Sequence, residues 1–236
     1  MSNILQGKIH IKGELKTITG LHIGGSKSIL EVGGIDNAII KTTKGKPYIP
    51  GSSLKGKLRN MLARAVGSKC VKTDIDLQEN SSGIRFIANI FGIPEGEDIK
   101  SEQTEALLKV RDCFPVENCM LEIKTENSIN RLTGEANPRP LERVAEGNFS
   151  LEMTLDVFDP EETKIYLKEI QLAMLLLEQD HLGGSGSRGC GKIKFSIQKL
   201  YYLKISDFKL AIDDSFEEDF DDFKTTINTS NTLWNQ

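Results

Sequence analysis

Residues 149–158 read FSLEMTLDVF, and the alternation of apolar side chains predicts a β-strand with one buried face. The residues on that face are Leu151, Met153, Leu155 and Val157. Residues 161–181 begin with acidic side chains and predict a helix. A glycine-rich loop at 183–191 and a final pair of strands are expected to follow. A strand, a helix, a loop and further strands in this order are typical of one half of an α+β domain.

The clearest predicted helix lies at residues 50–66, PGSSLKGKLRNMLARAV. Its apolar residues recur at i, i+4, i+7, i+8 and i+11, which places them on one helical face. They are Leu54, Leu58, Met61, Leu62 and Ala65. Ser52 or Ser53 is placed to cap the N-terminus. Before this helix, residues 7–19 predict a half-buried strand with a bulge near Gly13.

Further β-structure is expected on both sides of this helix. Residues 29–42 form a β-rich stretch that leads to a turn at 44–47, and strands are expected within residues 106–125. Residues 68–104 are polar and poorly periodic, apart from an apolar patch at 84–93, so they predict an insertion.

Residues 126–148, ENSINRLTGEANPRPLERVAEGN, are polar and contain two turn signals, which predicts a projecting hairpin or loop. The complete order of strand, helix, strands, helix and strand fits an α+β, ferredoxin-like core, in which two helices cover one face of an antiparallel sheet. The other face is then free to bind. Residues 1–212 are expected to form this domain, and residues 213–236 an acidic C-terminal tail.

The composition is that of an ordinary soluble globular protein, with 38% hydrophobic and 27% charged residues. No apolar run approaches the roughly 20 residues that span a bilayer, and the first residues lack the apolar region of a secretory signal. A cytoplasmic protein without a membrane partner is therefore predicted. The cysteines form no C-x-x-C pair, so in a reducing compartment they are expected to serve as small hydrophobic residues. They are Cys70, Cys113, Cys119 and Cys190.

The formal net charge is −4, but the charge is unevenly distributed. Residues 213–222 hold seven of the 34 acidic residues, so residues 1–212 carry 27 acids against 29 Lys and Arg residues. Within this mildly basic body, residues 37–73 contain nine Lys or Arg residues and residues 181–206 contain five, and neither stretch has an acid. Both are candidate phosphate-binding surfaces, although charge runs are also common on solvated faces.

The glycine-rich stretch at 182–195, LGGSGSRGCGKIKF, resembles three nucleotide-binding sequence patterns but meets the full requirements of none of them. The dinucleotide pattern follows a strand and opens a helix, whereas here a helix precedes and a strand follows. The Walker pattern fails because Ile193 stands where Ser or Thr is needed. Cys190 and Lys192 occupy the places of the stacking aromatic residues in the RNA-recognition octamer.

What remains is a run of exposed backbone N–H groups beside Arg188, Lys192 and Lys194, which suits a sugar-phosphate backbone. A glycine-rich loop is also often only a tight turn. The helix at 50–66 adds weight, because capped helix N-termini bind anions and its first two turns are basic. The basic residues there are Lys55, Lys57 and Arg59. Aromatic residues make up only 6% of the chain, so binding is expected to tolerate sequence and to depend on salt.

No Ser/His/Asp triad or metal-spaced histidine set stands out, and the best candidate for chemistry is Asp36 in GGIDNA. A carboxylate beside glycines and before a basic stretch could hold a hydrated magnesium ion, or orient a ribose 2′-hydroxyl for attack on the adjacent phosphate. His22 in TGLHIGG could contact RNA or act as a base, but a single histidine near a strand end is more often structural.

Taken together and in this order, these motifs resemble the RAMP superfamily and, within it, the repeated backbone subunit of type III-A CRISPR effector (Csm) complexes. The resemblance covers residues from about 5 to 205. The motifs that carry it are TGLHIGG with GGIDNA, IPGSSLKGKLRNMLARAVG, ENSINRLTGEANPRPLERV and DHLGGSGSRGCGKIKF.

The resemblance implies a modified RNA-recognition fold that assembles head to tail with other copies of itself along a CRISPR guide RNA, beside other subunits of the complex. Residues 126–148 would be a thumb that interrupts the guide–target duplex. It also implies cleavage of the target single-stranded RNA at regular intervals, with Asp36 as the catalytic residue and as a ligand of Mg²⁺ or another divalent cation. The residues expected to bind RNA are His22, Ser52, Ser53, Lys55, Lys57, Arg59, Asn130, Arg131, Arg139, Gly183, Gly184, Ser185, Gly186, Arg188 and Gly189.

Two alternatives stay open at the level of sequence. The chain could be a non-catalytic RNA-binding scaffold in which Asp36 is inert. It could also mature the guide precursor, as other RAMP-superfamily members do, although those enzymes act as single units.

Overall fold

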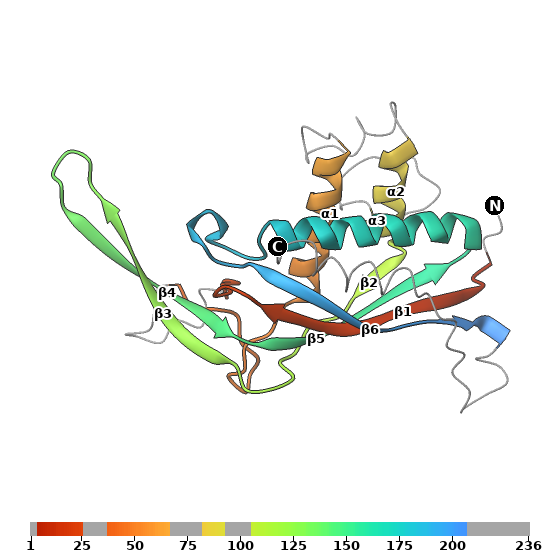
Figure 1. Ribbon diagram of the computed structural model, residues 1–236, viewed down its shortest axis with the longest axis horizontal. Helices are drawn as coiled ribbons and strands as arrows, with labels where there is room; N and C mark the ends of the chain where they lie inside the picture. The colour runs from red at the N-terminus through yellow and green to blue at the C-terminus, as the bar shows by residue number, and fades with distance from the viewer. Residues whose placement is uncertain (1–3, 26–36, 67–81, 93–104, 207–236) are drawn as a thin grey trace, which may run out of the picture.

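A four-stranded antiparallel sheet with three helices on one face forms the body of the protein (Figure 1). The computed structural model describes residues 4–25, 37–66, 82–92 and 105–206. The strand order is β2-β5-β1-β6, with all neighbours antiparallel. The strands are β1 (Gly7–Thr17), β2 (Leu108–Val110), β5 (Asn148–Val157) and β6 (Ile193–Lys204), and the helices are α1 (Gly51–Ala65), α2 (Ser82–Phe91) and α3 (Pro160–Gln179). The expected mixture of helices with an antiparallel sheet is confirmed.

The bulge predicted near Gly13 is confirmed in the pairing of β1 with β6. Lys12 pairs with Lys199 but Gly13 pairs with Ile197, so β6 contains one extra residue at this point. A Cβ atom on Gly13 would lie only 2.1 Å from the carbonyl oxygen of Ser196. Glycine is therefore needed here because the two backbones approach closely.

The core lies between the sheet and the helices. The predicted helix at 50–66 and the predicted strand at 149–158 are confirmed as α1 and β5, whose apolar faces are buried. The exception is Ala65, which is exposed because α1 ends there, while Ala63 is buried. Helix α3 begins where predicted, and the Asp159 side chain caps it by accepting hydrogen bonds from the N–H groups of Glu161 and Glu162.

Helix α2 lies within the stretch predicted as a poorly periodic insertion, and no helix was expected there. Its residues Ile87, Ile90 and Phe91 belong to the core. A helix of 10 residues bordered by polar sequence carries few turns of periodic signal, and tertiary burial of its apolar side stabilises it.

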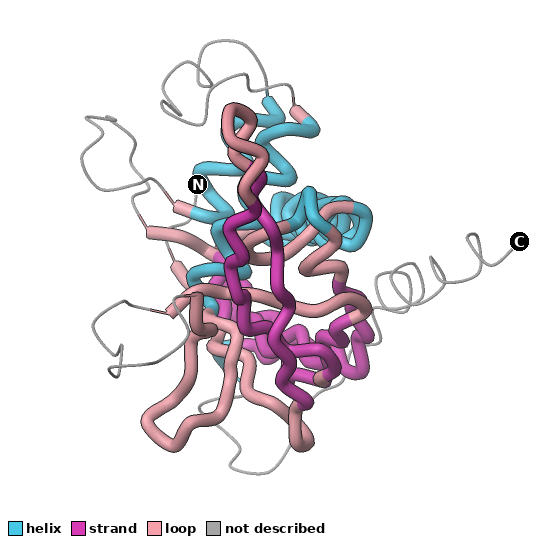
Figure 2. The backbone as a smooth tube through the Cα atoms, turned by 90° about the vertical axis from the view of Figure 1, so that its left-hand side faces the viewer, coloured by secondary structure: helices cyan, strands magenta, loops and turns pink. Residues whose placement is uncertain are grey.

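A long two-stranded hairpin projects from the body (Figures 1 and 2). It consists of β3 (Met120–Ile129) and β4 (Ala136–Glu146), paired in antiparallel register up to Ile129 and Ala136. The sequence predicts a hairpin or loop at 126–148; the observed hairpin begins six residues earlier, and Asn148 already belongs to β5. Most side chains of β3 are exposed, as expected of a strand with a single neighbour.

Two other β predictions are confirmed only in part. Within the described residues, the expected final strand pair is the single strand β6. Of the β-rich stretch at 29–42, residues 29–36 lie outside the described residues, and the remainder forms isolated bridges. The turn that follows is present, with Gly45 at φ +75° and its N–H donating to the Thr42 carbonyl oxygen at 2.9 Å. Residues 213–236, the predicted tail, lie outside the described residues.

The stability of the sheet is expected to fall in acid because of Asp156 on β5. Burial opposes ionisation of this carboxyl, but hydrogen bonds from the ammonium groups of Lys109 and Lys8 hold its pKa below the ordinary value of 3.8. A lowered folded-state pKa contributes stability that is complete above pH 3.8 and is lost as the pH falls through the folded-state value.

Urea denaturation should show that Asp156→Asn lowers the free energy of unfolding at pH 7 by about 1 kcal/mol and reduces its decline below about pH 4. Glu152→Gln is the control on the same strand, since Glu152 only approaches Lys12 at 3.8 Å and both side chains are well exposed. An acid-induced decline of unchanged size in Asp156→Asn would contradict the assignment.

Candidate functional site

The glycine-rich loop between α3 and β6 is folded back on the segment that follows β1. The N–H of Gly184 donates to the carbonyl oxygen of His22 at 2.8 Å, and that of Gly191 donates to the carbonyl oxygen of Gly20 at 3.0 Å. A short 3₁₀ turn, η2 (Gly186–Arg188), forms the end of the loop. Two stretches that are more than 150 residues apart are thereby joined through their backbones.

Several glycines of this loop are required by packing inside the protein. A Cβ atom on Gly183 would lie 2.2 Å from the His22 carbonyl oxygen, and one on Gly186 would lie 2.0 Å from the His181 ring. At Gly189, by contrast, φ is +83° and a Cβ atom would meet nothing within 4 Å. Close packing inside the protein thus explains Gly183 and Gly186, whereas Gly189 borders open space.

The sequence predicts a run of exposed backbone N–H groups in this loop, and hydrogen bonds within the chain already use several of them. Five N–H groups of the loop are donated within the chain, because the loop closes on itself and on residues 20–22. They belong to Gly184, Arg188, Gly189, Cys190 and Gly191.

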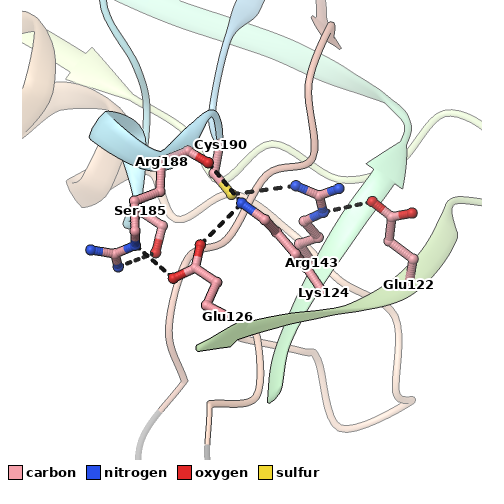
Figure 3. A network of polar contacts seen from close by, with 7 residues as sticks. All are labelled: Glu122, Lys124, Glu126, Arg143, Ser185, Arg188 and Cys190. Carbon is pink, nitrogen blue, oxygen red and sulfur yellow. Dashed lines mark hydrogen bonds and ion pairs between the residues drawn. The ribbon is translucent and has the colours of Figure 1, made fainter. Parts of the chain in front are cut away.

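Arg188 joins the loop to the hairpin (Figure 3). Its Nε donates to Glu126 on β3 at 2.6 Å, and its Nη2 donates to the Ser185 hydroxyl at 2.8 Å. Lys124 donates both to Glu126 at 3.0 Å and to the carbonyl oxygen of Arg188 at 2.7 Å. The Lys124 ammonium and the Arg188 guanidinium hold the pKa of Glu126 below its ordinary value. Because the Arg188 side chain is 59% exposed, it is still accessible to a phosphate group.

Arg143 on β4 makes a second link, which sequence reasoning missed (Figure 3). Its Nε donates to Glu122 at 2.6 Å and its Nη1 contacts the Cys190 sulfur at 3.5 Å. Its side chain also fills the space beside Gly20, where a Cβ atom would lie 2.3 Å from the Arg143 Cδ atom. Its partners come from three separate segments, so no local spacing could have identified it.

His22 lies at the centre of this region and is half-buried. Its Nδ1 is 2.7 Å from the carbonyl oxygen of Glu142 on β4. The Glu142 carboxylate accepts hydrogen bonds from the Ile39 N–H at 3.0 Å and from the Lys41 ammonium at 2.5 Å. This buried glutamate therefore fixes His22 and residues 39–41 to the base of the hairpin.

Asp36, the predicted catalytic and metal-binding residue, lies outside the described residues. The chain directly after it is described: the Asn37 carbonyl oxygen accepts a hydrogen bond from the Glu142 N–H at 3.1 Å, and its side-chain amide donates to the Pro140 carbonyl oxygen at 3.3 Å. The residue that follows Asp36 is therefore fixed against β4, beside the residues that hold His22.

The N-terminus of α1 differs from the expectation. Neither Ser52 nor Ser53 caps it; Pro50 occupies the N-cap position without a side-chain bond, and the Gly51 N–H donates to Asp112 Oδ1 at 2.7 Å. Ser52 is exposed and Ser53 half-buried. An acid of the same chain thus already occupies part of the predicted anion site, which weakens the argument for a phosphate at this position.

The basic residues of α1 have different surroundings. Lys57 donates to Asp180 at 3.0 Å, next to the start of the glycine-rich loop, and Asp180 also contacts His181 at 2.7 Å. Burial, with further contributions from the nearby charges of Lys109 and Arg59, lowers the pKa of Lys55. Arg59 is half-buried beside it.

The hairpin tip is shaped by Asn130, whose side-chain oxygen accepts hydrogen bonds from the N–H groups of Leu132 at 2.9 Å and Thr133 at 3.4 Å. Arg131 and Arg139 are exposed on the hairpin. The structure therefore brings His22, the glycine-rich loop with Arg188, and the chain after Asp36 together against residues 122–126 of β3 and 139–144 of β4, which are named here the hairpin base. Asn130 and Arg131 lie at the tip.

Neither a metal cluster nor a membrane span is evident in the described part of the chain. Among those residues, no three His, Cys, Asp or Glu side chains gather in a group that could hold a metal ion. No helix there is long and apolar enough to cross a membrane.

Comparison with known proteins agrees with this architecture. Residues 14–194 match the profile described as the RAMP superfamily. The endoribonuclease Csm3 of the CRISPR system Cms from Methanocaldococcus jannaschii is 41% identical over 211 residues, which cover 85% of this chain and 84% of the relative. The protein of the same name from Streptococcus thermophilus is 36% identical, over 80% of this chain and 87% of the relative. The chain therefore belongs to the RAMP superfamily and, within it, to the family of these Csm3 proteins.

A solved structure is similar over nearly the whole length of the chain. It is the crystal structure of the Csm3-Csm4 subcomplex in the type III-A CRISPR-Cas interference complex, in which one chain is 27% identical to this one. The match has a TM-score of 0.57 and covers 96% of this chain and 97% of the other.

The contact between the loop and His22 can be tested with two alanine substitutions in the same backbone conformation. Gly183 and Gly189 have φ values of +77° and +83°, so alanine at either position costs about 1–2 kcal/mol of backbone strain. Only Gly183→Ala also forces a methyl group against the His22 carbonyl oxygen, which should cost a further 1–3 kcal/mol, approximately. Urea denaturation of the two variants measures the difference, and equal losses would mean that the contact does not constrain the loop.

Proposed function

We propose that this protein is a guide-RNA-binding backbone subunit of a type III-A CRISPR effector complex that cleaves guide-paired target RNA at regular intervals. The observation that carries the proposal is the junction at the hairpin base, where the glycine-rich loop, His22 and the chain after Asp36 meet. The proposal is supported by the relatives, which are named endoribonucleases.

The proposed architecture is a ferredoxin-like core, a modified RNA-recognition fold, with β3 and β4 as its thumb. The strand order β2-β5-β1-β6, with helices between β1 and β2 and between β5 and β6, is that of a split βαβ arrangement. The hairpin is inserted between β2 and β5 and projects away from the sheet (Figure 1). An exposed hairpin of this length suits a device that reaches between paired strands of RNA.

RNA binding is proposed to depend on phosphates more than on bases. Arg188, Lys124 and Lys41 place cationic groups around the hairpin base, where Arg188 can contact a phosphate with two N–H groups. Lys57 adds a charge at the beginning of the loop. The proposed partners are the guide RNA, the target RNA, further copies of the chain in a head-to-tail filament, and other subunits of a type III-A complex.

The proposed reaction is attack of a ribose 2′-oxygen on the adjacent phosphorus, which leaves a cyclic phosphate and a 5′-hydroxyl. Asp36 is proposed to orient the 2′-hydroxyl or accept its proton. A single carboxylate together with substrate phosphates can hold Mg²⁺, which would neutralise charge on the phosphate. The Asn37 and Glu142 contacts would keep the backbone beside Asp36 in place during this reaction.

Asp36→Ala should abolish cleavage and leave binding intact. A complex reconstituted with guide RNA and incubated with matched target RNA should give regularly spaced, magnesium-dependent cuts in the wild type, and a loss of about 100-fold or more in rate in the variant. The matched control is Asn37→Ala, next in the chain, which should retain cleavage at a reduced rate. Tight binding without cuts from either protein would leave the scaffold interpretation standing, and cuts by Asp36→Ala would remove Asp36 from the mechanism.

The electrostatic part of the proposal concerns Lys57. Lys57→Ala should weaken guide RNA binding about fivefold and reduce the slope of log K against log salt by about 0.7, the value for one phosphate contact of a single strand. Lys164→Ala is the control, because Lys164 lies near the start of α3 and pairs with Glu161 on the surface. Filter binding between 50 and 300 mM salt, on the order of the physiological range, measures both slopes, and identical slopes would exclude Lys57 as a phosphate ligand.

A further inference from the structure

The sheet face opposite the helices carries a patch of basic and aromatic side chains. Cross-strand partners share a face, so the side chains of His10, Thr154 and Tyr201 lie together, with those of Lys8 and Lys12 beside them. The alternate residues of β1, including Ile9 and Ile11, are buried against the helices. This side of the sheet, the open face, is covered by none of the three described helices (Figure 1).

Positive charge predominates on the open face in the described part of the chain. Six lysines point to this side of the sheet, against three acids; the lysines are Lys8, Lys12, Lys16, Lys109, Lys194 and Lys199, and the acids are Glu14, Glu152 and Asp156. Asp156 is largely covered, because Lys8 and Lys109 both contact it. The face therefore favours an anionic partner.

The centre of the open face is aromatic. The His10 and Tyr201 rings stack with centroids 5.0 Å apart and an interplanar angle of 7°, and the Lys12 ammonium lies 5.8 Å from the centre of the Tyr201 ring. Both ring nitrogens of His10 are buried without a hydrogen-bond partner among the described residues. The histidine thus contributes a flat apolar surface here, suited to another aromatic ring.

The chain leaves the sheet at the edge of this same face. Strand β6 is an edge strand, and its last residue, Lys204, pairs with Gly7 at the beginning of β1. The sequence then continues for 30 residues beyond the last described one, Ser206. Residues 213–223, DDSFEEDFDDF, hold seven acids and three phenylalanines, and are named here the tail segment.

The tail segment is close enough to reach the patch. Residues 207–212 can span at most about 20 Å, whereas the eleven residues of β1 extend over about 36 Å. The His10–Tyr201 pair lies three residues, or about 10 Å, from the end of the sheet where Lys204 pairs with Gly7, so a segment that starts at most about 20 Å from that end can lie over it.

We propose that the tail segment binds the open face of its own chain, with its carboxylates against the lysines and its phenylalanines against His10 and Tyr201. Bound in this way, the tail keeps RNA phosphates off the basic face of the sheet. The proposal goes beyond the proposed function and holds whether or not the protein cleaves RNA, so the two can fail separately.

A zero-length carbodiimide cross-linker, which joins a carboxylate to a lysine in direct contact, tests the proposal on the full-length chain. Mass spectrometry is expected to find the Glu217 and Glu218 carboxylates joined to Lys8, Lys12, Lys16 or Lys199. The yield should fall about fivefold or more in 1 M NaCl, where screening acts within about 3 Å. Phe216→Ser with Phe220→Ser should lower the yield in the same way, whereas Lys44→Gln, in the exposed turn far along the chain, should not change it.

Three results would overturn the proposal. Cross-links mainly to Lys44, Lys46 or Lys57 would place the tail elsewhere. Cross-links between chains in a mixture of ¹⁵N-labelled and unlabelled protein would mean that a second copy is the partner. Full wild-type yield in a Tyr201→Ser variant with a native melting temperature would show that the aromatic centre has no role.

RNA binding gives an independent readout. Neutralising the tail in the full-length chain, by Asp213→Asn, Asp214→Asn, Glu217→Gln and Glu218→Gln, should strengthen binding to an unrelated single-stranded RNA about tenfold, since an opened basic face attracts phosphates. Adding Lys12→Gln and Lys16→Gln should reverse the gain. No gain, or a gain that persists without these lysines, would contradict the proposed position of the tail.

Discussion

The close backbone contact between the glycine-rich loop and residues 20–22 is the constraint on which the candidate site depends. It requires residues without a Cβ atom at Gly183, where a side chain would meet the His22 carbonyl oxygen at 2.2 Å. Strands β1 and β6 are antiparallel neighbours. The segment that follows β1 and the loop that precedes β6 therefore lie at the same end of the sheet. The sheet thus brings the glycine-rich loop close to residues 20–22, and the glycines allow the two backbones to come into contact.

The hairpin base is held to this contact by charged and polar side chains. Arg188 and Lys124 contact Glu126 from the loop side and the hairpin side, while Arg143 bridges Glu122 and Cys190. Glu142 binds the segment that follows Asp36 through hydrogen bonds with the backbone of Asn37 and Ile39. Exposed ion pairs are individually weak, so this junction combines a firm backbone contact with side chains that can exchange a protein carboxylate for a phosphate oxygen.

The two faces of the sheet have different chemistry for the same reason. Alternation along β1 sends Ile9, Ile11 and Leu15 towards the helices and the lysines and His10 to the other side. One face is thereby closed by the core, and the other presents charge and aromatic rings. The hairpin base and the open face are built from different residues, which permits one to hold RNA and the other to hold a different anionic partner.

Sequence alone determined the elements with strong local signals: α1 and α3, the buried face of β5, the bulge beside Gly13 and the presence of a hairpin all follow from periodicity and turn residues read within a dozen positions. The glycine-rich loop and His22 were also recognised from the sequence. Tertiary structure decided that Asp112 rather than a serine meets the start of α1, that α2 is helical, and that Arg143 and Glu142 join distant segments. These features depend on which residues come into contact after folding, and residues that contact one another across 21 to 120 positions leave no periodic pattern in the chain.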